Sequence, residues 1–153
     1  MITAGVESFA AGLEELKALL PGHYDELSQH SKRDIPLDPQ YGLYLAREAN
    51  GELMYVALRE DGRLIGYFLG FLAPGMHYRT CLTLTMDILY VVPEMRGVKG
   101  GMVLGQAIRN EAQRRGVKAW FMGFKEEHRE HMERMLLGLG FKPFERTYVC
   151  WLD

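Results

Sequence analysis

The sequence has few of the features that mark secreted, metal-binding or membrane-spanning proteins. Of its 153 residues two are cysteines, Cys81 and Cys150, and both lie in apolar runs, so we expect buried free thiols. No apolar stretch approaches the roughly 20 residues that cross a bilayer. Acidic residues interrupt the first apolar positions, so we expect no leader peptide and a cytoplasmic location. The five histidines lack ligand-like spacing, so no metal site is expected.

The chain also lacks a strong charge of either sign. Its formal net charge is −2, which gives no overall attraction to nucleic acid or to an anionic membrane. The apolar share of 48% and the charged share of 25% are those of an ordinary soluble domain, and 153 residues suffice for a single core. We therefore expect one domain over residues 1–153, without nucleic-acid or membrane binding. A cationic amine is not excluded as a ligand.

The first third of the chain is predicted to be mainly helical. Ser8 can cap a helix with an apolar stripe, which Pro21 and Gly22 should end. A weaker helical stretch follows over 24–30, and prolines indicate a loop over 31–40. Residues 43–50 fit either a short helix or an irregular connection.

The remainder alternates strands with helices. Strands are predicted over 53–59, 64–72, 80–92, 118–124 and 145–152, and helices over 102–115 and 126–139. The first three strands form an antiparallel meander. Because the strands are apolar on both sides, the sheet should be covered on both faces. We predict an α/β (α+β) fold with a mixed, mostly antiparallel sheet flanked by helices on both faces.

The stretch from Arg96 to Gly101 is predicted to be a glycine-rich turn between a strand and a helix. Such a turn directs backbone N–H groups and a helix dipole at one point, which favours an anion. Arg96 and Lys99 add positive charge. Neither a P-loop nor a dinucleotide fingerprint fits, because the Gly-Lys-Ser/Thr and Gly-x-Gly-x-x-Gly patterns are absent. The turn therefore indicates a phosphate-containing ligand; a turn without a ligand is the alternative.

Two motifs resemble those of GNAT acetyltransferases. Residues 89–97, Leu-Tyr-Val-Val-Pro-Glu-Met-Arg-Gly, are similar to the start of that family's coenzyme A motif. Residues 139–145, Leu-Gly-Phe-Lys-Pro-Phe-Glu, look like its C-terminal Leu-Gly-Phe turn. Lys99 stands where the family's middle glycine is expected. The pattern looks most like the small members found in bacteriophages and prophages.

The resemblance implies a cofactor site for acetyl-CoA over residues 53–153 and a variable acceptor side over residues 1–52. The backbone of Tyr90, Val91 and Val92 would pair with the pantetheine arm. Arg129 would contact the cofactor. The pyrophosphate would lie on the turn formed by Arg96, Gly97, Val98, Lys99, Gly100, Gly101 and Met102.

Acyl transfer to an amine needs a base for the amine proton, and Asp87 is our candidate. Strand alternation would place Asp87 on one face with the residues at positions 83, 85, 89 and 91. The alternative is that Asp87 only hydrogen-bonds a neighbouring loop.

The other catalytic and substrate positions are less defined by the sequence. Leu136 stands where the family has its tyrosine acid, so that acid is missing. Tyr148 on the last strand is a candidate substitute, or else a core tyrosine. His77 and Tyr78 are candidates for substrate recognition, with His77 as a second possible base, or else they form a plain turn.

The sequence thus predicts an N-acetyltransferase that uses acetyl-CoA and acts on a small-molecule or protein amine. The competing hypothesis is a non-catalytic module that binds acyl-CoA or a host protein, suggested by Leu136 and Lys99. An exposed edge at the final strand would allow a homodimer.

Overall fold

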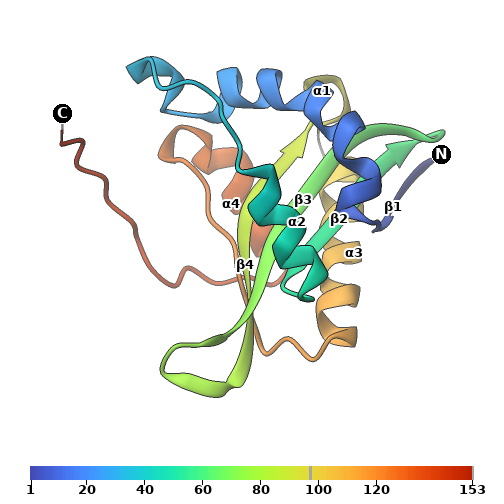
Figure 1. Cartoon of the computed structure of the whole chain (residues 1–153), viewed down its shortest axis with the longest axis vertical. Helices are drawn as coiled ribbons and strands as arrows, with labels where there is room; N and C mark the ends of the chain where they lie inside the picture. Colours follow the sequence, from blue (N-terminus) through green and yellow to red (C-terminus); the bar gives the residue numbers. More distant parts are fainter. Residues whose placement is uncertain (97, 153) are drawn as a thin grey trace.

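A computed structural model describes residues 1–96 and 98–152, which form one five-stranded sheet with helices on both faces (Figure 1). The strands are β1 (Ile2–Val6), β2 (Leu53–Glu60), β3 (Arg63–Gly75), β4 (Tyr78–Val91) and β5 (Ala119–Phe121). The α-helices are α1 (Phe9–Leu27), α2 (Tyr41–Ala49), α3 (Val98–Arg114) and α4 (Arg129–Gly138). Short 3-10 helices cover Ser31–Arg33, Pro93–Met95 and Glu126–His128.

The sheet follows chain order, β1-β2-β3-β4-β5. The first four strands pair antiparallel, and β5 lies parallel to β4 because α3 provides the crossover between them. The predicted mixed, mostly antiparallel sheet is therefore confirmed.

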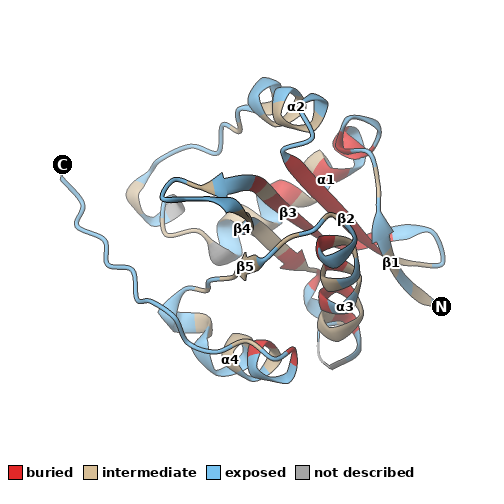
Figure 2. Ribbon diagram, turned by 90° about the horizontal axis from the view of Figure 1, so that it is seen from below, coloured by how far each residue is buried: buried red, intermediate tan, exposed pale blue. Residues whose placement is uncertain are grey.

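Helices cover both faces of the central strands (Figure 2). On one face α1 packs through Phe9, whose ring meets that of Tyr55 edge-on at 5.9 Å. On the other face α3 passes so close to the sheet that a Cβ on Gly100 would lie 3.6 Å from the side chains of Leu58 and Val91. Residues 53–58 of β2 and 64–69 of β3 are consequently buried without alternation.

The amino end of α1 is fixed by its own cap and by α2. Ser8 Oγ accepts from Ala11 N at 3.2 Å. Glu48 of α2 accepts from Phe9 N at 2.6 Å and from Ala10 N at 3.1 Å. These carboxylate contacts satisfy two of the helix's unpaired N–H groups, so α1 and α2 form one unit over the sheet.

The predicted helix end at Pro21 and Gly22 is wrong, because α1 continues through both to Leu27. Proline removes one intrahelical hydrogen bond. The helix persists because residues beyond it pack on the sheet: His23 stacks on Tyr90 at a centroid distance of 4.6 Å. Tertiary packing here outweighs a local helix breaker.

The predicted strand over 145–152 is also wrong. These residues have no strand pairing and run away from the body of the molecule (Figure 1). Apolar content favours a strand only where a partner edge is available. The side chains of Phe144, Tyr148, Val149, Cys150 and Leu152 are exposed, so Cys150 is not the buried thiol that was expected, whereas Cys81 is half-buried.

The structure also contains a strand and a helix that the sequence pattern did not define. The sequence pattern does not indicate β1, whose five residues are mostly exposed. The ambiguous stretch near residue 43 is helix α2. In the described part of the chain no helix is long and apolar enough to cross a membrane.

Candidate active site

A β-bulge in β4 positions Asp87. The register pairs Met86 with Gly70 and Ile88 with Leu69, so Asp87 is the extra residue without a partner on β3. A bulge bends its strand and re-aims the side chain at the extra residue. Asp87 therefore lies at an irregularity in the sheet, beneath helix α2.

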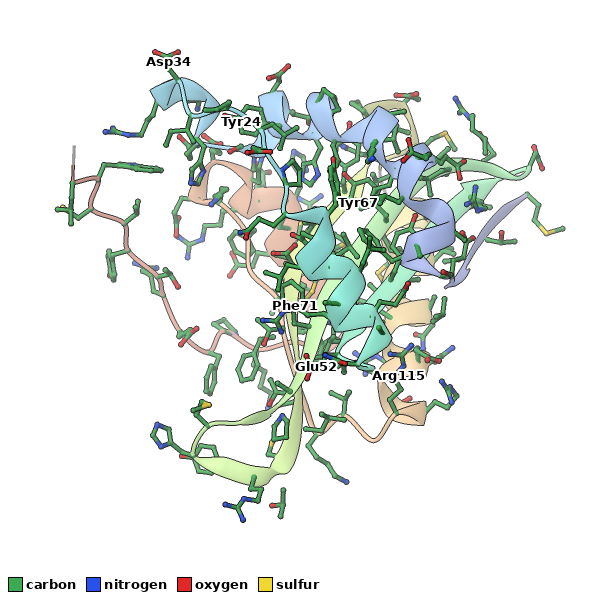
Figure 3. The ribbon with its side chains drawn as sticks, in the orientation of Figure 1. Tyr24, Asp34, Glu52, Tyr67, Phe71 and Arg115 are labelled. Atoms are coloured by element: carbon green, nitrogen blue, oxygen red, sulfur yellow. The ribbon has the colours of Figure 1, made fainter. Side chains whose placement is uncertain are left out.

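The bulge changes which residues share a face with Asp87. Thr85 pairs with Phe71, whose ring lies 5.8 Å from that of Tyr44 on α2, so the expected grouping of Asp87 with residues 83 and 85 agrees with the structure. Figure 3 shows Phe71 beneath α2. Val91, by contrast, faces α3. The prediction that positions 89 and 91 share the face of Asp87 is wrong, because the extra residue reverses the alternation.

The Asp87 carboxylate is held by Tyr44. The Tyr44 hydroxyl donates to Asp87 Oδ2 at 2.5 Å. Burial raises the pKa of Asp87 above its usual value, whereas the Tyr44 hydrogen bond and the charge of Arg47 act in the opposite direction. A carboxylate with a raised pKa is a better proton acceptor than an aspartate with its ordinary pKa.

Beyond the bulge, β4 has an edge that β5 does not cover. The parallel pairing extends only from Thr83–Ala119 to Thr85–Phe121. Val92 N donates to Ile65 O at 2.8 Å and thus faces β3. By strand alternation Tyr90 also presents its N–H and C=O to β3, and Val91 presents its own to the open edge. Of the three predicted pantetheine partners, Val91 is the one whose backbone is oriented for that pairing.

The predicted glycine turn is the first turn of α3, which begins at Val98 instead of Met102. Gly97 lies outside the described residues. The N–H groups of this first turn have no intrahelical acceptor and are available to an anion. A Cβ on Gly100 would lie 2.7 Å from Met95 O, so Gly100 is needed for the close approach of the helix to the preceding segment. Lys99 is exposed beside it.

Arg96 is engaged within the protein. Its guanidinium forms a two-pronged ion pair with Glu26 of α1, and its Nε donates to Val91 O at 2.8 Å. The Arg96 hydrogen bonds hold the pKa of Glu26 below its usual value. A phosphate reaching Arg96 would have to replace the Glu26 carboxylate.

His23 supports the same end of β4. Its Nδ1 lies 2.8 Å from the Tyr67 hydroxyl (Tyr67 is labelled in Figure 3), and its ring stacks on Tyr90. Burial lowers the pKa of His23 to about 4, so the ring is neutral at pH 7.

The other predicted site residues are not gathered at Asp87. His77 and Tyr78 lie at the exposed tip of the β3–β4 hairpin, about 30 Å along the strand at 3.3 Å per residue. Tyr148 is 83% exposed on the C-terminal segment, so it is not a core tyrosine. Arg129 begins α4 and pairs with Glu126 and Glu133. The structure therefore does not make His77 and Asp87 parts of one site.

A cavity of about 260 Å³ is lined by two neighbours of Asp87, its hydrogen-bond partner Tyr44 and the next residue Ile88, and the sequence did not indicate this cavity. Tyr44 and Ile88 form part of its wall. The other sides come from α1, the loop over residues 35–39 and Leu69 of β3. The Tyr24 hydroxyl in this wall is buried and has no hydrogen-bond partner among the described residues. Asp87 thus stands between an open strand edge and a cavity under α1 and α2.

No protein-family model and no curated protein matches this sequence. Solved structures match its fold over nearly the whole chain. A ribosomal-protein-alanine N-acetyltransferase from Brucella melitensis biovar Abortus 2308 aligns with a TM-score of 0.72 at 14% identity, covering 100% of each chain. An aminoglycoside acetyltransferase from an uncultured soil metagenomic sample aligns with a TM-score of 0.76 at 8% identity, covering 99% of this chain and 95% of the other.

A third similar structure is an aminoglycoside N-acetyltransferase in complex with CoA, with a TM-score of 0.71, 15% identity, and coverage of 99% of this chain and 95% of the other. The fold of the chain is that of GNAT N-acetyltransferases. At these identities the likeness concerns the fold.

Proposed function

We propose that this chain is an acetyl-CoA-dependent N-acetyltransferase in which Asp87 accepts the proton of the attacking amine. The observation that carries the proposal is the placement of Asp87. It is an exposed carboxylate on a bulge, held by Tyr44 of the cavity wall, on a strand whose edge is open beyond the bulge.

The proposed cofactor site consists of backbone groups. The first-turn N–H groups of α3 would hold the pyrophosphate, with Lys99 and Arg96 beside them. The N–H of Val91 would pair with a pantetheine carbonyl, while its C=O already accepts from Arg96 Nε at 2.8 Å. The close approach at Gly100 fits this role, since it aligns the first turn of α3 with the end of β4.

In the proposed reaction an amine loses a proton to Asp87, directly or through one water, and its nitrogen attacks the thioester carbonyl. The amide bond forms, the carbon–sulfur bond breaks, and the departing thiolate takes a proton. Leu136, at the family's acid position, is buried and has no proton to give. Tyr148, the candidate substitute, is 83% exposed on the C-terminal segment, so we assign the thiolate proton to water.

The division of the chain follows the same proposal. Residues 1–52 supply β1, α1, α2 and the loop around the cavity, and residues 53–153 supply the other four strands, α3 and α4. A homodimer, a role for Arg129 and the likeness to phage proteins stay predictions from the sequence.

The proposal is tested by calorimetric titration with CoA, followed by measurement of CoA release from acetyl-CoA across a panel of amines. Binding and amine-dependent release support it. The competing hypothesis, a non-catalytic acyl-CoA-binding module, predicts binding with no release above the rate without amine. Absence of binding at millimolar CoA in a folded sample rejects both.

A further inference from the structure

The cavity beside Asp87 has a wall that restricts which amines it can take. Most of its lining side chains are apolar or aromatic, including Leu16, Leu20, Leu37 and Tyr41. Among the described residues, the lining positions that are polar and not tyrosines are Ser28, His30 and Asp38. The wall thus offers one carboxylate.

A polycationic ligand fits such a wall poorly. Each ammonium group taken out of water needs a carboxylate or several hydrogen-bond acceptors in exchange, and without them its desolvation opposes binding. An apolar body instead gains free energy from the area it removes from water. The volume of about 260 Å³ lies just below the usual range for ligand sites, about 300–1,000 Å³, so the ligand is compact.

The polar groups of the wall agree with one amine and few other polar atoms. Asp87 is outside the wall itself, but it accepts from the hydroxyl of Tyr44 and precedes Ile88, and both of these residues line the cavity. The orphaned Tyr24 hydroxyl can pair with one further polar atom, which would remove the cost of leaving a buried hydroxyl unpaired.

We propose that this cavity binds the body of the acceptor, and that the acceptor is a compact monoamine with an apolar or aromatic body. This inference rests on the proposed function. The acceptor expected here differs from those of the aminoglycoside acetyltransferases that share the fold, since aminoglycosides carry several ammonium groups.

The test compares kcat/KM for 2-phenylethylamine and isoamylamine with that for glucosamine and kanamycin. We expect the first pair to exceed the second by at least about tenfold, as is usual for a pocket that selects by apolar contact. The melting temperature with each amine, measured without acetyl-CoA, gives a second readout that does not depend on turnover.

Two variants test whether the preference for apolar amines depends on the cavity wall. Leu37→Asp adds a carboxylate to the wall at a loop position that is 38% exposed, so the fold should tolerate it. Leu137→Asp makes the same change on α4, at a residue that is 54% exposed and outside the cavity wall. We expect Leu37→Asp to lower kcat/KM for 2-phenylethylamine at least about tenfold, with unchanged CoA affinity, and Leu137→Asp to change neither.

The outcomes separate this inference from the proposed function. Preferred turnover of glucosamine or kanamycin, with CoA bound, overturns the inference and leaves the acetyltransferase proposal standing. The inference is also overturned if the chain binds CoA but the apolar amines give neither turnover nor a shift in melting temperature. A folded chain that does not bind CoA overturns both.

Discussion

Asp87 is the extra residue of the bulge in β4. It keeps the face that alternation from Thr85 gives it, under α2, where it accepts from the Tyr44 hydroxyl. Val91 would share that face in a regular strand, but after the bulge it faces α3. The candidate base could be predicted from the sequence because acyl transfer needs a proton acceptor and Asp87 lies on the strand that leads into the coenzyme A-like motif. Its partner Tyr44 could not, because the contact joins residues 43 positions apart.

Tyr44→Phe tests that contact through the pH dependence of the reaction. The Tyr44 hydrogen bond lowers the pKa of Asp87, so its removal raises that pKa further. A base works only when ionised, and activity is lost as pH falls through its pKa. The acidic limb of the kcat/KM profile should therefore move to higher pH in Tyr44→Phe. Tyr41→Phe, the neighbouring phenol of α2, is the control, and an unmoved acidic limb in both variants would contradict the assignment.

At the scale of elements, the sequence predicts helices and strands well where the pattern is local. It predicts them poorly where packing between distant residues determines the bounds of an element. The β2–β3 hairpin and α3 follow from periodicity and turn residues. The continuation of α1 through Pro21 depends on His23 stacking against Tyr90, a contact that no local pattern contains. The first turn of α3 was predicted as a glycine-rich turn ahead of a helix that begins at Met102, whereas the helix begins at Val98. Here Gly100 is used for a close approach to Met95.

Gly100→Ala should therefore destabilise the protein, although Gly→Ala within a helix usually stabilises by about 1 kcal/mol. The new Cβ would lie 2.7 Å from a backbone oxygen, and overpacking of this kind costs about 1–3 kcal/mol. We expect a lower melting temperature and weaker CoA binding by calorimetry.

Gly42→Ala on α2 is the matched control, because nothing lies within 4 Å of its added Cβ. Equal stability and equal CoA affinity of Gly100→Ala and wild type would show that α3 has room to move from the strand end.

At the scale of the whole molecule, the sheet ends at β5 and the last residues do not extend it. Phe144 touches Phe121 at a centroid distance of 5.2 Å, and Trp151 meets His30 at 5.0 Å, with exposed chain between these contacts. The sequence suggested a strand there because apolar and aromatic residues are frequent in it. A strand also needs an edge to pair with, and pairing is a property of the whole fold.

Truncation after Phe144 should consequently change the free energy of unfolding by less than about 1 kcal/mol, or about 2–4 °C in melting temperature for a chain of this size. The same samples, measured by light scattering, report whether the segment affects the oligomeric state. A loss of 10 °C or more would contradict this account and favour the strand over residues 145–152 that the sequence predicted.

The central claim, that Asp87 is the base of an acetyl transfer, is tested most directly by the turnover of Asp87→Asn. General-base catalysis contributes about 10²–10⁴-fold, so kcat should fall by that order, while the CoA dissociation constant stays the same because the cofactor is held elsewhere. The folded carboxyl has a raised pKa, so its ionised form opposes folding above the unfolded pKa, and the amide should not lower the melting temperature. A folded Asp87→Asn variant within threefold of the wild-type rate would contradict the account.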